Sequence, residues 1–543
     1  NEFISHKDNE ALKEMNGSKT MQNNTEKEKI EQEYLLSQFI DFFQNSKTYI
    51  GILYLLFFAI YGSWAYTYFV SFDAEGQYRL SDANRWYTSW IYLGRWGFYY
   101  LKRLLNVELS NYSIAVFLIC FPLSAVIWSF VLQQWLKIQK QVLFFVFSIV
   151  YLTQPIWALQ FAYRNQIEAC SIVMCFLPVG MVLFSTWQEK PKLLYLICSI
   201  FFVTYSFGSY QSFLFVYGAA FLLYLLALFL QNLTVKQIWK KFCFGVLFTI
   251  ICFGLYVLIT KILVYVLKIP DTYGSYLSDQ FRWGKEPFST CILRVKNYLK
   301  NGLYGNGVEF TGWYGFLFLL SILCLCGKAN ISMVHKFFCL ILLGGMLIIP
   351  FALDIVTAGT IVSRSRFAYV FVLAVMVFLV LLEGNSFIRP QVIRYLILLF
   401  LFVRFLLPQI EILNRLLYTD ARTMRDDYQW MEHIYFKAKE LGAEDGMPLA
   451  FLGDASNVDD ETMLNWEIVG ESYFEVLRMY QQPIHSNKTV EAMQSYGFPF
   501  TQCTPEQVEL AVSVGKDMKA CWPRAGGIKI VDGVVIVKLS EQE

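Results

Sequence analysis

The feature that most constrains this chain is a succession of apolar runs, each about as long as a lipid bilayer is thick. A hydrocarbon core takes roughly 20 residues of helix to cross. The 543-residue sequence is 56% hydrophobic and only 16% charged, whereas soluble domains are roughly 25% charged. We therefore predict an integral membrane protein. Eleven apolar runs are candidate spans, at 49–70, 112–131, 141–159, 167–186, 193–209, 211–230, 242–264, 311–327, 336–353, 367–383 and 393–410.

The loops between these runs predict the sidedness of the chain. With the N-terminus in the cytoplasm, every inner loop is short and carries basic residues, as the positive-inside rule requires. An odd number of spans then places the C-terminal segment outside. Only "SFGSYQS" separates the fifth run from the sixth, so a merger there would reverse everything downstream.

Composition divides the chain into three regions. We expect a polar cytoplasmic segment at 1–47, an all-α transmembrane domain at 48–410 whose first outer loop is 71–111, and a small extracytoplasmic α/β domain at 411–543. In the last region Gly442 ends a predicted helix. "MPLAFLG" indicates a buried strand, and "IKIVDGVVIVKL" indicates a β-hairpin. If this region faces an oxidising compartment, Cys503 and Cys521 could pair.

Several functional classes are disfavoured by the sequence. The formal net charge is +2 and no block of basic residues suggests a nucleic-acid partner. No glycine-rich phosphate loop is present, which argues against ATP or a nucleotide sugar as substrate. No Cys/His spacing indicates zinc.

The first outer loop places two acids, Asp73 and Glu75, just beyond the first span, in "SFDAEGQYRLSD". "ANRWYTSWIYLGRWGFYYLKRLL" follows, with aromatic and apolar residues at helical spacing and basic residues between them. This pattern predicts a helix in the membrane interface, with its aromatic side towards lipid and its basic residues available to phosphate. From position alone, the acids are either catalytic or a solvated pair that closes a helix.

This combination resembles the first outer loop of GT-C fold glycosyltransferases, and more narrowly the bacterial glucosyltransferases of the Gtr type II family. The residues that carry the resemblance are Asp73, Gly76, Trp90, Gly94 and Arg95. One alanine separates the two acids here, whereas the family is associated with adjacent acids. Asp73 is the preferred general base and Glu75 the second candidate.

The resemblance implies a fold, a reaction and a location. The expected donor is a polyprenyl-phosphate-linked hexose, namely glucose on undecaprenyl phosphate, and the expected acceptor is a cell-surface polysaccharide. Transfer would invert the anomeric carbon in a single displacement, outside a bacterial plasma membrane, with the lipid bilayer as the setting. The resemblance leaves the cofactor unknown, with a divalent cation such as Mg²⁺ or Mn²⁺ as an option.

Such a transfer also needs cationic groups that stabilise the leaving phosphate. Arg364 and Arg366 in "SRSRF" are the first candidates, because they contradict the positive-inside rule on an outer segment. They could equally anchor a helix in lipid headgroups. Arg95 and Arg282 are weaker candidates, and Arg404, inside the last span, is costly unless paired or near water.

The other outer segments offer sugar contacts. Arg164 could bind sugar or only neutralise Glu168 four residues later. Tyr210 and Gln211 suit a sugar pocket as well as a tight turn, and Asp354 could be a further acid facing the cleft.

Two alternative functions use the same ingredients. A lipid-linked glycan ligase or polymerase would need the same acids and cations. A lipid or solute transporter would carry charges along a mid-membrane path and inverted repeats of its helices. The polar residues here gather towards one face and no such repeat is present, which favours an enzyme.

Overall fold

The computed structural model describes residues 3–71, 89–106, 112–270, 279–328, 331–359, 361–387, 391–455, 461–475 and 486–541. Asp73 and Glu75 lie outside these described residues. The chain divides into two units, 1–54 and 55–543. The first unit contains the N-terminal part of a long helix, α1, and the second contains the other helices and the sheet.

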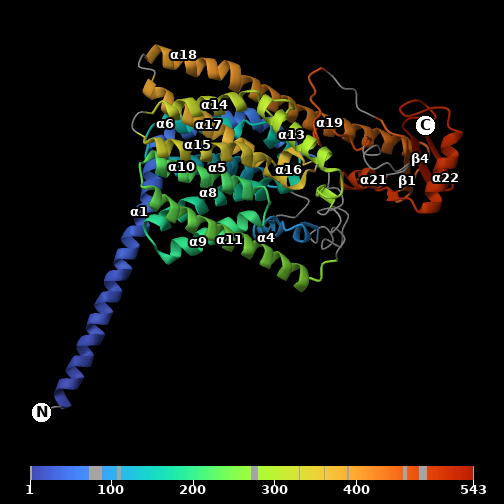
Figure 1. Cartoon of the computed structure of the whole chain (residues 1–543). Helices are drawn as coiled ribbons and strands as arrows, with labels where there is room; N and C mark the ends of the chain where they lie inside the picture. Colours follow the sequence, from blue (N-terminus) through green and yellow to red (C-terminus); the bar gives the residue numbers. More distant parts are fainter. Residues whose placement is uncertain are drawn as a thin grey trace. The chain divides into compact units, whose positions relative to one another are not determined.

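Helices make up most of the described chain (Figure 1). Those in the region of the predicted spans are α1 (Phe3–Tyr66), α4 (Trp96–Leu104), α5 (Ile114–Leu136), α6 (Gln141–Leu152), α7 (Ile156–Phe161), η1 (Arg164–Gln166), α8 (Ile167–Glu189), α9 (Leu193–Phe207), α10 (Phe213–Leu230), α11 (Val235–Val266), α13 (Phe288–Tyr304), α14 (Trp313–Cys326), α15 (Met333–Ile348), η2 (Ile349–Phe351), α16 (Ala352–Thr357), η3 (Ser363–Ser365), α17 (Phe367–Phe387), α18 (Gln391–Leu401), η4 (Phe402–Leu406) and α19 (Leu407–Glu440).

The eleven apolar runs are largely helical, although the third, 141–159, is divided between α6 and α7. Among the described residues, seven helical segments are long and apolar enough to cross a membrane, and α6, α9, α14 and α17 are shorter apolar helices. The protein is therefore a multi-pass membrane protein, and eleven crossings stay a prediction. The fifth and sixth runs form separate helices, α9 and α10. The predicted boundary at residue 410 falls inside α19, which continues as one helix to Glu440.

Burial separates central from peripheral helices. From Phe367 to Leu381, α17 is buried on every side, as expected for a helix that is apolar all round. It packs against α6, α10 and α14. In contrast, α11 leaves large apolar side chains such as Leu247, Ile250 and Phe253 uncovered. Such a surface suits contact with lipid rather than water.

The C-terminal region forms the predicted small α/β fold. Its sheet has the order β2-β1-β4-β3, in which β1 pairs in parallel with β2 and β4, and β3 pairs antiparallel with β4. The strands and helices are β1 (Pro448–Leu452), α21 (Ser486–Ser495), β2 (Thr501–Gln502), α22 (Pro505–Lys516), β3 (Ile528–Val531) and β4 (Val534–Lys538). Figure 1 shows α21 and α22 beside this sheet. Cys503 and Cys521 are both free thiols.

The aromatic residues of the first outer loop lie differently from the prediction. Gly94 has a φ of +75°, which ends a helical turn before α4 begins at Trp96. Trp96 and Phe98 are buried against the protein, with Trp96 5.5 Å from Tyr205 between ring centroids and Phe98 stacked on Tyr210. The expectation that this aromatic side faces lipid is wrong, because glycines let α4 approach the α9–α10 turn closely enough to bury it.

Candidate functional site

Arg366 lies at the centre of a buried group of polar side chains, which we call the Arg366 cluster: Arg366, Asp354, Glu309 and Ser363. Nη2 of Arg366 lies 2.8 Å from Oδ1 of Asp354, on α16. Nη1 lies 3.8 Å from Oε1 of Glu309 and donates to the hydroxyl of Ser363 at 3.2 Å. That hydroxyl donates to Glu309 at 2.6 Å. The arginine is thus held between two carboxylates, in a buried position.

Some polar atoms of the Arg366 cluster have no hydrogen-bond partner within it. Nε of Arg366, Oε2 of Glu309 and Oδ2 of Asp354 are buried and have no hydrogen-bond partner among the described residues. Burial also raises the pKa of Glu309 above its ordinary value, which hydrogen bonding from Ser363 and the charge of Arg366 only partly oppose. Buried polar atoms without partners are rare and call for an explanation, such as a ligand or ion.

Arg364 has a different partner from Arg366. Its Nη1 lies 3.8 Å from Oε2 of Glu467, and its guanidinium lies 4.4 Å from the ring centroid of Tyr163. Glu467 also accepts a hydrogen bond from the backbone N–H of Ser363. Both predicted phosphate-binding arginines therefore have carboxylate partners, which lowers the positive charge that either offers to a ligand.

Arg164 is buried in an aromatic cage. Its guanidinium lies 3.5 Å from the ring centroid of Trp64 and 4.2 Å from that of Phe69. Nη2 lies 3.9 Å from Asp420 of α19 and donates to the carbonyl of Trp64 at 3.0 Å. The backbone N–H of Arg164 donates to Oγ of Ser71 at 3.2 Å.

Of the two roles offered for Arg164 and Glu168, sugar contact or mutual neutralisation, the ion pair between them does not form. Glu168 instead lies 2.9 Å from Nζ of Lys102 on α4, and both side chains are fully buried. Burial lowers the pKa of Lys102, and the charge of Glu168 partly offsets that shift. Packing, rather than helical spacing, selects these partners, because a buried charge needs a close counter-charge from whichever element packs against it. Lys102 is therefore not available to a phosphate at the surface.

Arg95, Tyr210 and Gln211 lie close together around the turn before α4. The guanidinium of Arg95 lies 4.7 Å from the ring centroid of Tyr210. Tyr210 stacks in turn on Phe367, the residue after Arg366, with centroids 5.4 Å apart. Gln211 donates to the carbonyl of Leu93 and so holds the turn before α4.

Arg282 differs from the arginines described above because its side chain is exposed. Its side chain is 44% exposed and lies 3.6 Å from Glu286, four residues later. Its backbone N–H donates to the carbonyl of Thr357 at the end of α16. An exposed ion pair of this kind contributes little, and Arg282 is the least supported of the predicted phosphate ligands.

A cavity of about 580 Å³ lies beside the Arg366 cluster. Phe310, which lines it, has its ring centroid 5.4 Å from the guanidinium of Arg366. The walls are largely apolar, with five aromatic side chains, and come from the turn between α6 and α7, the segment before α14, and α14, α18, η4 and α19. The lining residues are Gln154, Pro155, Val308, Phe310, Thr311, Gly312, Trp313, Phe316, Phe400, Arg404, Phe405, Pro408, Gln409 and Ile412.

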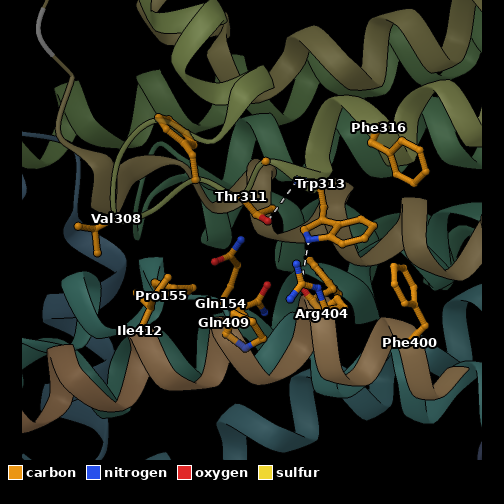
Figure 2. A pocket seen from close by; sticks show the side chains of 14 residues that line it. Gln154, Pro155, Val308, Thr311, Trp313, Phe316, Phe400, Arg404, Gln409 and Ile412 are labelled. Carbon is orange, nitrogen blue, oxygen red and sulfur yellow. Dashed lines mark hydrogen bonds between the residues drawn. The ribbon is translucent and has the colours of Figure 1, made fainter.

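Arg404 faces this cavity, and a local distortion of the helix accompanies it (Figure 2). Residues Phe402–Leu406 form a π-helical turn, a feature that often marks functional sites. Pro408 has no N–H to donate to the carbonyl four residues earlier, which is that of Arg404. Nε1 of Trp313 donates to this carbonyl at 3.2 Å. Arg404 has no ion-pair partner within the part of the chain that the structure describes.

Sequence reasoning missed four residues of this site. Glu309 and Glu467 were not predicted, although a lone acid directly before an apolar run is a usable signal for Glu309. The amides of Gln154 and Gln409 gave no signal at all. Asp354 was expected as an acid facing the cleft, and it is found beside Arg366. No group of three or more His, Cys, Asp or Glu side chains is placed to hold a metal among the described residues.

Apolar helices that surround buried arginines, carboxylates and an amphipathic cavity define a polytopic membrane protein with a polar binding site. The comparison with protein families names the class more closely. Residues 79–382, which are more than half of the chain, match the family Glucosyl transferase GtrII. The chain belongs to this family and is a glycosyltransferase. The search of curated proteins found no match. The matched region contains Arg95, Arg164, Arg282, Arg364 and Arg366, but it begins after Asp73 and Glu75 and ends before Arg404.

Proposed function

We propose that the protein transfers a hexose, glucose, from a polyprenyl-phosphate carrier to a cell-surface glycan outside a bacterial plasma membrane. The observation that carries this proposal concerns Arg404. This arginine lies in an apolar helix segment, has no ion-pair partner among the described residues, and lines the cavity beside aromatic side chains. A charge in such a segment is costly unless it serves a site. A lipid phosphate supplies both the anion for Arg404 and an apolar chain for the aromatic walls.

The order of the lining residues supports this assignment. Phe400, Arg404 and Pro408 are spaced four residues apart, so they follow one face of the helix. Phe316 and Phe400 are 52% and 54% exposed and give the cavity an apolar rim. In the proposed complex the isoprenoid chain leaves between these two rings, and the phosphate lies at Arg404.

The catalytic base in this proposal is Asp73, with Glu75 as the second candidate. Ser71, two residues before Asp73 in the chain, accepts a hydrogen bond from the backbone of Arg164, close to the other outer segments. A carboxylate there would take the proton of the acceptor hydroxyl while cations stabilise the leaving phosphate. Arg364 and Arg366 then serve mainly to hold Glu467, Asp354 and Glu309 in place.

The experiment is hexose transfer from a lipid-phosphate donor by the full-length protein in liposomes. Asp73→Asn is expected to lower kcat by at least about 100-fold, the usual contribution of general-base catalysis. Glu75→Gln is the matched variant and is expected to lose less. Wild-type kcat in Asp73→Asn, with a loss in Glu75→Gln, would transfer the role to Glu75, and full activity in both would reject an acid of this loop as base.

A further inference from the structure

The polar end of the cavity carries two amide side chains with atoms that have no hydrogen-bond partner among the described residues. Gln154 is 1% exposed, and both its Nε2 and its Oε1 have no hydrogen-bond partner among the described residues. Gln409 donates through Nε2 to Thr153 and Val150 at 2.9 and 3.2 Å, yet its Oε1 is also buried and unpartnered. Figure 2 shows both amides directed into the cavity, on one side of Arg404.

The unused atoms specify a ligand chemistry. Gln154 offers donors and an acceptor, and Gln409 offers an acceptor only. A hydroxyl group both donates and accepts, so neighbouring hydroxyls on one ring can satisfy all of these atoms. A charged group would not, because a phosphate or carboxylate only accepts and would leave both amide oxygens unpaired. The aromatic walls meanwhile suit the apolar face of a ring.

We propose that this end of the cavity binds the hexose ring of the donor, and that Gln154 and Gln409 determine which hexose is accepted by bonding to its hydroxyl groups. The inference rests on the proposed function, because it places the sugar next to the phosphate at Arg404. A site built to bond a substrate hydroxyl discriminates strongly against an analogue that lacks or misplaces it. The cavity volume of about 580 Å³ is within the range of small-molecule sites, roughly 300–1,000 Å³.

The test compares two probes on the full-length protein in detergent. One is a short-chain polyprenyl-phosphate glucose, and the other is the same lipid phosphate without sugar. Wild type is expected to bind the glucosylated lipid at least about fivefold more tightly. Gln154→Leu and Gln409→Leu are each expected to weaken binding of the glucosylated lipid about three- to tenfold, as loss of one hydrogen bond implies. Binding of the sugar-free lipid should not change.

Gln160→Leu is the matched control. Gln160 lies on α7 and is also buried, but it does not line the cavity. Its replacement should leave the affinities for both probes unchanged. Because Gln154 has no protein partner to lose among the described residues, Gln154→Leu should fold and show no lower Tm than wild type. A changed Tm together with equal loss of both probes would mean a structural role and would overturn the inference.

Specificity gives a second readout. Wild type is expected to prefer the glucosyl lipid to its galactosyl epimer, and the two leucine variants should reduce that preference. The inference is overturned if wild type binds both probes equally, or if both variants keep the wild-type preference for glucose. A wild-type protein that binds the glucosyl lipid through these amides but transfers no sugar would contradict the proposed function while supporting the binding site.

Discussion

Arg164 and Asp420 form an ion pair inside the protein, with Nη2 of the arginine 3.9 Å from Oδ2 of the aspartate. The same carboxylate oxygen accepts a hydrogen bond from the indole of Trp64 at 2.7 Å. Arg164 belongs to η1, and Asp420 belongs to α19, the helix that leads to the C-terminal sheet. Buried polar contacts therefore fix α19 against the segments that carry the predicted outer site.

Removing only one member of this pair should be worse than removing both. Asp420→Leu leaves the guanidinium of Arg164 buried without a counter-charge, which costs about 3–5 kcal/mol of unfolding free energy. The double variant Arg164→Met with Asp420→Leu should lose less, since it buries no unpaired charge. The measurement is the free energy of unfolding of the single and the double variant in detergent. Equal losses in the single and double variants would show that the charge pairing is unimportant.

Glu309 should make stability depend on pH. Burial raises its pKa in the folded protein above the ordinary carboxyl value of about 4.3. The folded state therefore binds the proton more tightly, and this stabilisation is present below about 4.3 and is lost as pH rises through the raised pKa. Glu309→Gln, which keeps a neutral side chain, should remove this fall. The measurement is the Tm of wild type and of Glu309→Gln as the pH rises from about 4.3 through the raised pKa. Parallel curves of Tm against pH would contradict the raised pKa of Glu309.

The close contact between α4 and the α9–α10 turn should not tolerate a side chain at Gly97. A Cβ there would overlap Oγ of Ser209 and would lie 3.1 Å from the carbonyl oxygen of Gly208. We expect Gly97→Ala to cost about 1–3 kcal/mol of stability, typical of overpacking. Gly254→Ala in α11 is the control, because nothing lies within 4 Å of its Cβ and alanine favours helix there. Equal Tm values for the two variants would contradict the buried placement of α4.

Arg404 should matter for binding the donor more than for folding. Arg404→Gln keeps a polar side chain but removes the cation that we assign to the lipid phosphate, and hydrogen bonds to charged groups contribute about 1.5–3 kcal/mol. We therefore expect KM for a lipid-phosphate sugar to rise at least about tenfold. Arg422→Gln, at an exposed ion pair on α19, is the matched control. An unchanged KM in Arg404→Gln would place the phosphate elsewhere.

Local patterns gave the parts of the fold that depend on local physics. The eleven apolar runs are largely helical, with the third divided between α6 and α7. Asp532-Gly533 forms the predicted hairpin turn, with both residues at positive φ. Gly442, at a φ of +95°, follows the end of α19 as expected. These features follow from periodicity and turn chemistry, which are encoded within a few residues.

The partners of the buried charges could not be predicted in this way. Helical spacing allowed Glu168 either to contact sugar or to neutralise Arg164 four residues away, but Glu168 pairs with Lys102 from another helix. The pairing depends on which helices pack together, and neither helical spacing nor hydropathy contains that information. The sequence indicated that Arg404 would be costly in a span unless it were paired or near water, and Arg404 lines the cavity. The roles of Asp73 and Glu75 stay predictions, because both lie outside the described residues.

The central claim is that the hexose comes from a lipid phosphate. The most direct measurement supplies the purified full-length protein in liposomes with radiolabelled glucose on a polyprenyl phosphate, or with radiolabelled nucleotide glucose. The acceptor is surface glycan from cells that lack this protein. We predict label in the glycan from the lipid donor only, and its loss in Asp73→Asn. Label from the nucleotide sugar alone, or from neither donor, would contradict the account.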